Sequence, residues 1–373
     1  MRALVAGAAG FLGSHLCDRL RRDGIEVLGL DNFYTGSREN IRHLEDDPGF
    51  DFFEHDITRP IDAAGVGPLD VIFNMACPAA PLTYQRDPLF TLETNYSGVR
   101  NLLELARVKG ATTLQSSTSE VYGDPAVHPQ VESYWGNVNC FGVRSCYDEG
   151  KRIAETLMLE YARRYGVRIK VVRIFNTYGP RMDPEDGRII ATFIVQALRG
   201  EPITVFGDGS QTRSFCYVDD LVDGLVKMAA SDPSFIGPVN LGSTAEFTAE
   251  EAASLIKEMT RSPSPTIHKS LPSDDPRQRK PDISLAESKL GWRPQVPFEQ
   301  GVARTIEYFR GRMAGQADQL QCVPIRYGRV PCGVDAGLRA GTAKHPEGGP
   351  CGPPAKEFPG LPRSANPAAP NHD

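Results

Sequence analysis

The stretch from Arg2 to Asp31, RALVAGAAGFLGSHLCDRLRRDGIEVLGLD, decides the fold of this 373-residue chain. It begins with a short apolar strand pattern, which is followed by a turn containing Gly7, Gly10 and Gly13. An amphipathic helical pattern comes next, and a second apolar strand ends in the acidic residue. Strand, glycine turn, helix, strand and acidic residue in this order are typical of a dinucleotide-binding unit. The stretch therefore predicts that the chain begins as an open parallel α/β sheet.

The special residues of this unit each have a physical reason to be there. The first two glycines let the backbone approach a pyrophosphate at a helix N-terminus, where free N–H groups and a partial positive charge meet it. Gly13 allows the helix to pack tightly on the strand. Asp31 can accept a hydrogen bond from an adenosine ribose hydroxyl and would repel a 2′-phosphate, so the predicted cofactor is NAD rather than NADP. A glycine triplet alone could be an ordinary turn, but the full set of five elements favours the cofactor site.

A second stretch, from Ser116 to Lys151, carries the candidate chemistry. Tyr147 and Lys151 stand four residues apart where a helical pattern begins, and this spacing places both side chains on one helix face. A nearby ammonium favours the phenolate, so we expect the pKa of Tyr147 to be lowered from about 10 towards neutrality. Such a tyrosine could take a proton from a sugar hydroxyl while a hydride leaves the same carbon. A solvated helix face is the alternative, which the preceding strand-end hydroxyls of Ser117 and Thr118 disfavour.

Composition excludes several other classes of protein. The chain is 40% hydrophobic and 24% charged with a net charge of −6, as in a soluble globular protein, and this charge predicts no nucleic-acid partner. No apolar run reaches about 18 residues, so neither a membrane segment nor an export signal is expected. The eight cysteines lack paired C-x-x-C spacing, which argues against a metal site and for reduced thiols in a cytoplasmic protein.

The order of strand patterns predicts three regions. Residues 1–175 should form the dinucleotide-binding domain, with some later segments returning to it. Residues 176–312 contain short strands and turns that interrupt the regular alternation, which favours a smaller, substrate-facing lobe with a last helix ending near Arg312. Residues 313–373 are rich in proline and glycine without any apolar period, so we expect this tail to be disordered.

The spacing G-x-x-G-x-x-G resembles the extended branch of the short-chain dehydrogenase/reductase superfamily. This resemblance implies a Rossmann-like doubly wound parallel sheet with a smaller C-terminal lobe, and it places Asp56 and Ile57 beside the adenine. Cys77 follows a buried strand at its carboxyl end, where an open parallel sheet binds its ligand. The candidate cofactor-binding residues are Gly7, Gly10, Phe11, Leu12, Gly13, Asp31, Asn32, Thr35, Gly36, Asp56, Ile57, Cys77, Thr94, Ser116, Tyr147, Lys151 and Thr177. For Thr94, as for Asn95 and Asn101, a hydrogen bond to the backbone is the open alternative.

Six motifs bring the chain closer to one family. They are ACPA at 76–79, TSEVYGDP at 118–125, CYDEGKR at 146–152, RIFNTYGPRM at 173–182, GSQTRSF at 209–215 and RKPDI at 279–283. Over about residues 1–312 the sequence resembles the UDP-glucuronic acid decarboxylases (UDP-xylose synthases). The resemblance implies that UDP-glucuronate is converted to UDP-xylose through a UDP-4-keto intermediate, with NAD retained, and that the enzyme is a homodimer formed by the helices near 90–108 and 147–165.

The same resemblance assigns roles to individual residues. It implies that Tyr147 is the acid/base, that Lys151 holds both the tyrosine and the nicotinamide ribose, and that Thr118 bonds the sugar hydroxyl being oxidised. Glu120, following Ser119, and Arg279 are expected at the carboxylate end of the sugar. The implied substrate-binding residues are Asn176, Arg188, Gln211, Arg213 and Tyr217. For Arg213 a surface position is the open alternative, and for Arg279 the open alternative is a solvated run of charged residues.

Two other functions stay open. One is a UDP-sugar 4-epimerase or 4,6-dehydratase of the same branch, which Ser119, Glu120 and Arg279 disfavour. The other is an NAD-binding regulatory protein that has lost turnover. This second reading rests on residues 139–144, where the chain has NCFGVR and the family pattern is close to N-P-I-G-P-R. Two prolines that would stiffen the approach to Tyr147 are missing there, and Asn74 replaces a usual histidine.

Overall fold

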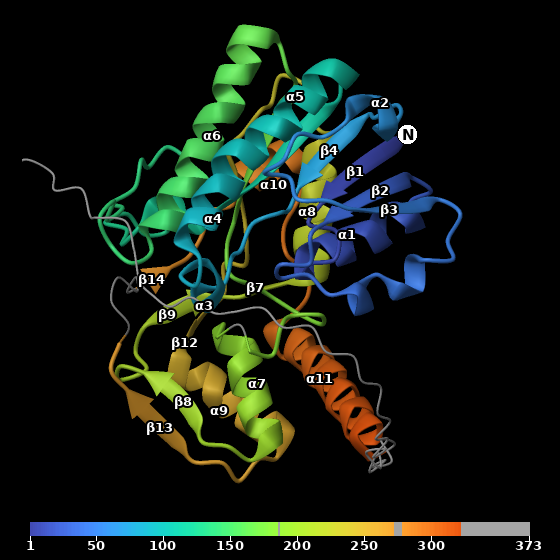
Figure 1. The fold of residues 1–373 in the computed structure, drawn as a ribbon. Coiled ribbons are helices and arrows are strands. Elements are labelled where there is room, and N and C mark those ends of the chain that lie inside the picture. Colours follow the sequence, from blue (N-terminus) through green and yellow to red (C-terminus); the bar gives the residue numbers. More distant parts are fainter. Residues whose placement is uncertain (186, 272–277, 322–373) are drawn as a thin grey trace, which may run out of the picture. The chain divides into compact units, whose positions relative to one another are not determined.

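A seven-stranded parallel sheet forms the centre of the computed structural model, which describes residues 1–185, 187–271 and 278–321 (Figure 1). The strand order is β11-β6-β5-β4-β1-β2-β3, and every neighbouring pair is parallel. The strands are β1 (Arg2–Ala6), β2 (Glu26–Asp31), β3 (Phe50–Glu54), β4 (Val71–Asn74), β5 (Thr112–Thr118), β6 (Ile169–Ile174) and β11 (Val239–Leu241). The order reverses between β1 and β4, which places the ligand crevice at their carboxyl ends.

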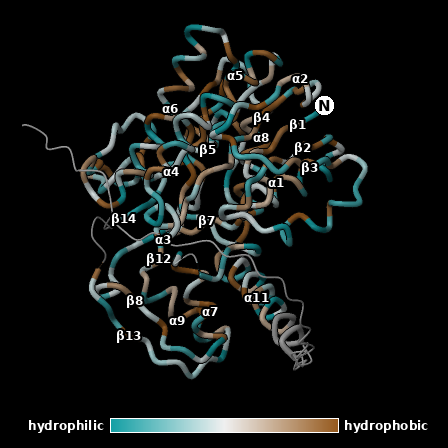
Figure 2. Tube along the Cα trace, in the orientation of Figure 1, coloured by the Kyte–Doolittle hydropathy of each residue, from teal (hydrophilic) through white to brown (hydrophobic). Residues whose placement is uncertain are grey.

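Helices cover both faces of this sheet because successive strand residues point to opposite sides. Ala3 and Val5 of β1 share a core with α1 (Phe11–Arg22) and α8 (Val218–Ala230), whereas Leu4 and Ala6 share another with α5 (Val99–Lys109) and α6 (Ser145–Tyr165). Figure 2 shows the central strands as largely apolar. The predicted doubly wound, Rossmann-like fold is confirmed.

One long helical segment begins near the crevice and continues over one face of the sheet. It consists of α4 (Pro88–Glu93), the π-helical turn η3 (Thr94–Gly98) and α5. A π-turn adds a residue to the helical repeat and is frequently found at functional sites. Here it turns Thr94 into the crevice, where that residue lines a pocket.

The residues after β6 contribute smaller sheets, of which one brings two arginines together. The strands β12 (Glu246–Thr248), β9 (Thr212–Ser214) and β14 (Gln278–Arg279) form one sheet, and the parallel register of β9 and β14 aligns Arg213 with Arg279. Two-stranded sheets pair β7 (Thr177–Tyr178) with β10 (Cys216–Tyr217) and β8 (Ile203–Phe206) with β13 (Thr266–Lys269). The remaining elements are η1 (Arg38–Asn40), η2 (Arg42–Leu44), α2 (Ala63–Val66), α3 (Pro81–Tyr84), η4 (Ser119–Tyr122), α7 (Ile189–Arg199), α9 (Ala249–Thr260), α10 (Ser284–Leu290) and α11 (Phe298–Gln321).

The last helix, α11, continues to Gln321, past Arg312 where the apolar pattern indicated its end. The added segment Met313–Gln321 contains mainly Ala, Gln, Leu and Met, whose high helix propensity needs no apolar stripe. Residues 322–373, which make up most of the predicted disordered tail, lie outside the described residues. None of the described helices is long and apolar enough to span a membrane.

Candidate active site

The glycine turn between β1 and α1 forms the floor of a pocket at the sheet crevice, with a volume of about 280 Å³. Gly7 has φ +80°, a left-handed conformation that side chains rarely adopt, and a Cβ there would lie 2.8 Å from the backbone nitrogen of Ala76. A Cβ at Gly13 would lie 1.9 Å from the carbonyl oxygen of Gly7. Helix α1 can therefore begin directly above the strand only because both residues lack a side chain, and the backbone stays open to a pyrophosphate.

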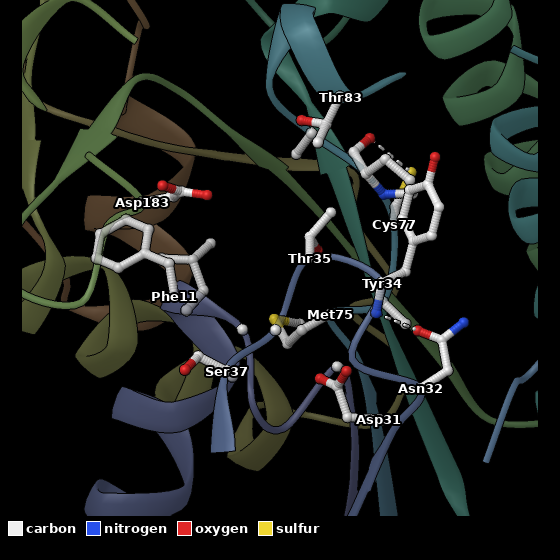
Figure 3. Close-up of a pocket in the computed structure, with 18 of the residues that line it drawn as sticks. Phe11, Asp31, Asn32, Tyr34, Thr35, Ser37, Met75, Cys77, Thr83 and Asp183 are labelled. Atoms are coloured by element: carbon white, nitrogen blue, oxygen red, sulfur yellow. Dashed lines mark hydrogen bonds between the residues drawn. The ribbon is translucent and has the colours of Figure 1, made fainter. Parts of the chain in front are cut away.

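Most of the predicted cofactor residues line this pocket. Figure 3 shows Phe11 and Asp183 on one side of the view and Tyr34 and Cys77 on the other. The predicted residues among the lining are Gly7, Gly10, Phe11, Leu12, Gly13, Asp31, Asn32, Thr35, Gly36, Asp56, Ile57, Cys77 and Thr94. The predicted residues outside the lining are Ser116, Tyr147, Lys151 and Thr177.

Asp31 ends β2 and is held by backbone amides. One carboxylate oxygen accepts a hydrogen bond from Ala9 N at 2.9 Å and the other accepts one from Phe33 N at 2.8 Å. Burial raises the pKa of Asp31, and these backbone donors act against the shift. Each oxygen keeps a second lone pair, so the residue can shape the turn and still accept from a ribose hydroxyl.

Replacing Asp31 with Asn is expected to lower the affinity for NAD by about tenfold or more, because the ribose hydroxyl would lose its hydrogen bond to a charged acceptor, which is worth about 1.5–3 kcal/mol. The preference for NAD over NADP should shrink as well, since the charge that repels a 2′-phosphate is gone. Calorimetric titration with both nucleotides measures this, with the exposed Asp51→Asn as the control. Unchanged NAD affinity in Asp31→Asn would contradict the assignment.

The polar residues on the long helix mostly bond to the backbone. The Thr94 hydroxyl donates to Phe90 O, and the Asn101 amide donates to Ile57 O at 2.9 Å, which fixes the segment expected beside the adenine. The Asn95 amide donates to Thr91 O and also contacts the Cys77 sulfur at 3.1 Å. The backbone alternative therefore holds for all three, and Thr94 additionally lines the pocket.

The second predicted stretch folds into β5, η4 and the first turns of α6. Lys151 is buried and donates from Nζ to Ser116 O at 2.9 Å, while its ammonium lies 5.7 Å from the centre of the Tyr147 ring. Ser116 donates to Asn74 O, and the Thr118 hydroxyl accepts from Glu120 N. The chain thus brings Tyr147 and Lys151 to the carboxyl end of β5 beside the hydroxyl residues, as the spacing indicated.

The predicted lowering of the Tyr147 pKa is wrong for this structure. The phenol is buried, and removal from water raises its pKa well above the ordinary value of 10. The neighbouring Cys77, Glu120 and Tyr84 raise it further, while the Thr118 side chain lowers it. Lys151 does not reverse this, because its ammonium is directed to the Ser116 carbonyl. Helical spacing indicated the neighbour correctly but carried no information about desolvation.

Glu120 lies in a buried ion-pair cluster. Arg279 donates to both of its carboxylate oxygens, at 2.5 and 2.8 Å, and Arg144 lies 2.9 Å from one of them. Burial alone would raise the pKa of Glu120, but the two guanidinium groups prevail and lower it to about 2. Arg279 is buried, so the solvated charge run considered from the sequence is excluded.

The structure separates the predicted substrate residues into distinct groups. Arg213 is buried on β9 in register with Arg279, which excludes a surface position. Arg188 instead lies over the Phe11 ring at 5.4 Å, beside the dinucleotide pocket. Tyr217 is buried against Tyr178 and beneath Arg304. Gln211 donates to Phe206 O, and the carbonyl of Asn176, before β7, accepts from Cys216 N.

Sequence reasoning missed three residues that the fold brings to Tyr147 and Glu120. Tyr84 of α3 stacks on Tyr147, with ring centres 4.9 Å apart and an interplanar angle of 8°. Arg144 binds Glu120, and Asp148 is buried close by. A signal existed for the last two, because positions 144, 147, 148 and 151 recur at intervals of three and four and share one helix face. Tyr84 gave no such signal.

Comparison with known proteins identifies one family and several similar enzymes. A family model described as the NAD dependent epimerase/dehydratase family matches residues 3–242. UDP-glucuronic acid decarboxylase 6 of Arabidopsis thaliana is 51% identical over 314 residues, which cover 84% of this chain and 90% of that protein. UDP-glucuronic acid decarboxylase 1 of Xenopus tropicalis is 49% identical, with 87% and 75% covered.

Solved structures with the same fold include two 4-epimerases. The UDP-glucuronic acid 4-epimerase of Bacillus cereus, in complex with UDP-glucuronic acid and NAD, has a TM-score of 0.77 at 29% identity and covers 84% of this chain and all of its own. The UDP-glucose 4-epimerase of Thermotoga maritima, with UDP-glucose, has a TM-score of 0.76 at 31% identity with the same coverage.

Proposed function

The chain belongs to the NAD-dependent epimerase/dehydratase family, and from that premise we propose that it decarboxylates UDP-glucuronate to UDP-xylose with NAD as cofactor. The observation that carries the proposal is the buried carboxylate of Glu120, held by Arg279 and Arg144 beside Tyr147. Relatives about half identical over most of the chain are UDP-glucuronic acid decarboxylases, which supports the same activity.

The pocket residues fit NAD. Gly7, Gly10 and Gly13 leave the backbone bare at the N-terminus of α1, where a pyrophosphate is bound by N–H groups. Asp31 receives the adenosine ribose, and the segment Asp56–Ile57 borders the adenine end. When bound, NAD supplies the acceptor of the hydride from C4 of the sugar and later its donor. Lys151, one helical turn after Tyr147 on α6, orients the nicotinamide ribose.

Tyr147 and Thr118 act on the sugar hydroxyl at C4. The Thr118 hydroxyl bonds it, and Tyr147 takes its proton as the carbon is oxidised, a role that contributes about 10²–10⁴-fold in rate. Because burial raises the pKa of the free tyrosine, Tyr147 first has to give its own proton to solvent. The phenolate that results is a strong base for the hydroxyl proton. Asn176, Gln211, Arg213 and Tyr217 contact the UDP part, and Arg188 closes over the nucleotides.

Oxidation at C4 places a ketone β to the C6 carboxylate. Such an acid loses CO₂ readily, since the electron pair of the breaking C5–C6 bond flows into an enolate oxygen, which Tyr147 stabilises as a hydrogen-bond donor. Arg279 binds and orients the carboxylate, and Glu120, beside Ser119, assists its displacement. Protonation at C5 and reduction at C4 then complete UDP-xylose.

The altered loop before α6 does not remove this constellation. Cys140 and Phe141 are exposed, and Phe141 is 98% accessible. Arg144 nevertheless holds Glu120 at the start of the helix, and Ser145 anchors the turn by donating to Gly142 O. These contacts hold the start of α6 without the two prolines, which favours an active enzyme over a regulatory protein without turnover.

The test is to incubate the purified protein with UDP-glucuronate, with and without added NAD, and to identify the products by mass spectrometry and NMR. UDP-xylose and CO₂ without net NADH are expected. The C4 epimer of the substrate would instead assign a 4-epimerase, and no turnover with NAD still bound would assign the regulatory protein. A 4-keto pentose with accumulating NADH would mean that the intermediate leaves before it is reduced.

The enzyme is also proposed to be a homodimer that joins α4, α5 and α6 of each subunit. Large apolar side chains stand exposed on these helices, among them Leu89 (77%), Leu92 (39%) and Ile153 (40%), and Leu92 and Ile153 line one shared pocket. Exposed apolar surface on adjoining helices is typical of subunit interfaces.

The cytoplasmic location of the protein stays a prediction.

Replacing both Leu89 and Ile153 with Glu is expected to convert the dimer into a monomer, because each charge would be desolvated at the centre of the interface. Light scattering coupled to size-exclusion chromatography measures the mass directly. Phe53→Glu, which changes an equally exposed apolar residue on β3, should leave the dimer intact. A wild-type chain that is monomeric at all concentrations would refute the interface.

A further inference from the structure

Four charged side chains meet in a buried cluster beside Tyr147: Glu120, Arg144, Asp148 and Arg279. Arg144, Asp148 and Arg279 are 8%, 6% and 4% exposed, and the Glu120 side chain is 13% exposed. Charges buried to this degree are costly unless they are paired. Three of the four are paired with each other, since both arginines bind Glu120.

Asp148 is the member without such a partner. Its Oδ1 is buried and makes no hydrogen bond with any residue that the structure describes. The residue follows Tyr147 on α6 and lies one turn after Arg144, whose carbonyl oxygen accepts from Asp148 N at 3.1 Å. A carboxylate so placed is either ionised in an unfavourable site or protonated.

The surroundings of Asp148 favour the protonated form of its carboxyl group near neutral pH. Burial and the charges of Glu120 and Glu149 raise its pKa, while Arg144 and Arg279 lower it, with a result of about 7. Among the described residues, the phenols of Tyr84 on α3 and Tyr147 on α6 also face the cluster, and both remain neutral because burial raises their pKa. The four side chains therefore carry a net charge of +1 with Asp148 protonated and zero with Asp148 ionised.

The two states of Asp148 differ by one charge, and one negative charge is also what the substrate carboxylate brings on binding and loses as CO₂. We propose that Asp148 is a positioning residue that stores a proton: it takes one up when the substrate carboxylate enters beside Arg144 and Arg279, and gives it up when that carboxylate leaves as CO₂. The inference rests on the decarboxylase function proposed above, and it adds Arg144 and Asp148 to the residues that serve the reaction.

Proton uptake and release by Asp148 account for the proton that the reaction consumes. On binding, the Asp148 carboxylate gains a proton from solvent, so the entering negative charge is compensated. When the C5–C6 bond breaks, its electron pair forms the enolate and neutral CO₂ departs. The O–H bond of Asp148 then breaks and its proton passes to the site, which supplies the proton with which the enolate electron pair forms the C5–H bond. One proton is consumed for each CO₂ released.

Calorimetry with UDP-glucuronate tests the inference on Tyr147→Phe protein carrying NAD, which binds the substrate without turning it over. Titrations at pH 8 in buffers of different ionisation enthalpy give the number of protons taken up. A carboxyl with a pKa of about 7 is about one-tenth protonated there, so uptake should approach about 0.9 proton. UDP-xylose, which lacks the carboxylate, should cause no uptake. Equal proton counts for the two nucleotides would overturn the inference whatever the variants do.

Two variants in the same background assign the proton to Asp148. Asp148→Asn keeps the shape of the protonated group and should abolish the uptake, and Asp148→Ser replaces it if the amide variant does not fold. The matched control is Glu149→Gln, whose half-exposed carboxylate lies near Arg152, and it should retain the uptake. Full uptake in a folded Asp148 variant would refute the assignment.

The pH dependence of binding gives a second readout that a merely structural role would not change. Substrate binding raises the pKa of Asp148, so the affinity for UDP-glucuronate should fall as the pH rises above about 7, by up to about tenfold per unit. Asp148→Asn should flatten this profile. The inference and the proposed function can fail separately. If the wild-type protein forms UDP-xylose while Tyr147→Phe takes up no proton, the function holds and only this inference is refuted.

Discussion

Replacing Glu120 with Gln is expected to slow CO₂ release by about 10²–10⁴-fold, the range that a positioned acid/base group contributes. The physical reason is the ionised state of this carboxylate, whose pKa is held at about 2 by Arg279 and Arg144. A neutral amide cannot compensate two guanidinium groups, so the carboxylate of the substrate would be bound too tightly between them and its departure would be opposed. CO₂ and UDP-xylose are measured together in single-turnover experiments.

The same change also leaves two buried cations without their anion, which costs about 3–5 kcal/mol of stability when a buried pair is broken. Glu155→Gln controls for this, because Glu155, also on α6, forms a similarly buried pair with Arg173 at 2.8 Å. Both variants should melt at lower temperature, and only Glu120→Gln should lose CO₂ release. Turnover like that of the wild type in Glu120→Gln would remove this residue from the mechanism.

Replacing Tyr147 with Phe is expected to reduce turnover at least as strongly, with binding of NAD and UDP-glucuronate preserved. The variant loses the hydroxyl that moves the proton at C4 but keeps the ring, which stacks on Tyr84 at 4.9 Å. The melting temperature should therefore change little. Rapid mixing of NAD-loaded protein with substrate should show no NADH absorbance in the variant.

Tyr84→Phe is the matched control for this result. Its hydroxyl is buried and has no hydrogen-bond partner among the described residues, so its removal leaves no donor or acceptor behind. Stacking on Tyr147 is preserved, and turnover close to that of the wild type is expected. If Tyr84→Phe were as inactive as Tyr147→Phe, the proton transfer would have to be reassigned to the pair of tyrosines.

The sequence by itself determined the sheet and the cofactor end of the site. The apolar runs of β1 and β2, the glycines at 7, 10 and 13, and Asp31 at a strand end are local features, and short-range backbone sterics are sufficient to predict what they form. The spacing of Tyr147 and Lys151 was equally local. These residues lie where the pattern indicated because each constraint acts within one turn or one strand.

Only the tertiary structure decided the electrostatics of the catalytic end. Glu120 and Arg279 are 159 residues apart and meet because β14 pairs with β9 and delivers the arginine beneath η4. Arg144 and Asp148 join them on one helix face, and the direction of the Tyr147 pKa follows from burial rather than from the lysine four residues away. Coulomb energy and desolvation depend on distance through space and on exclusion of water, and neither quantity is written in the spacing of residues along the chain.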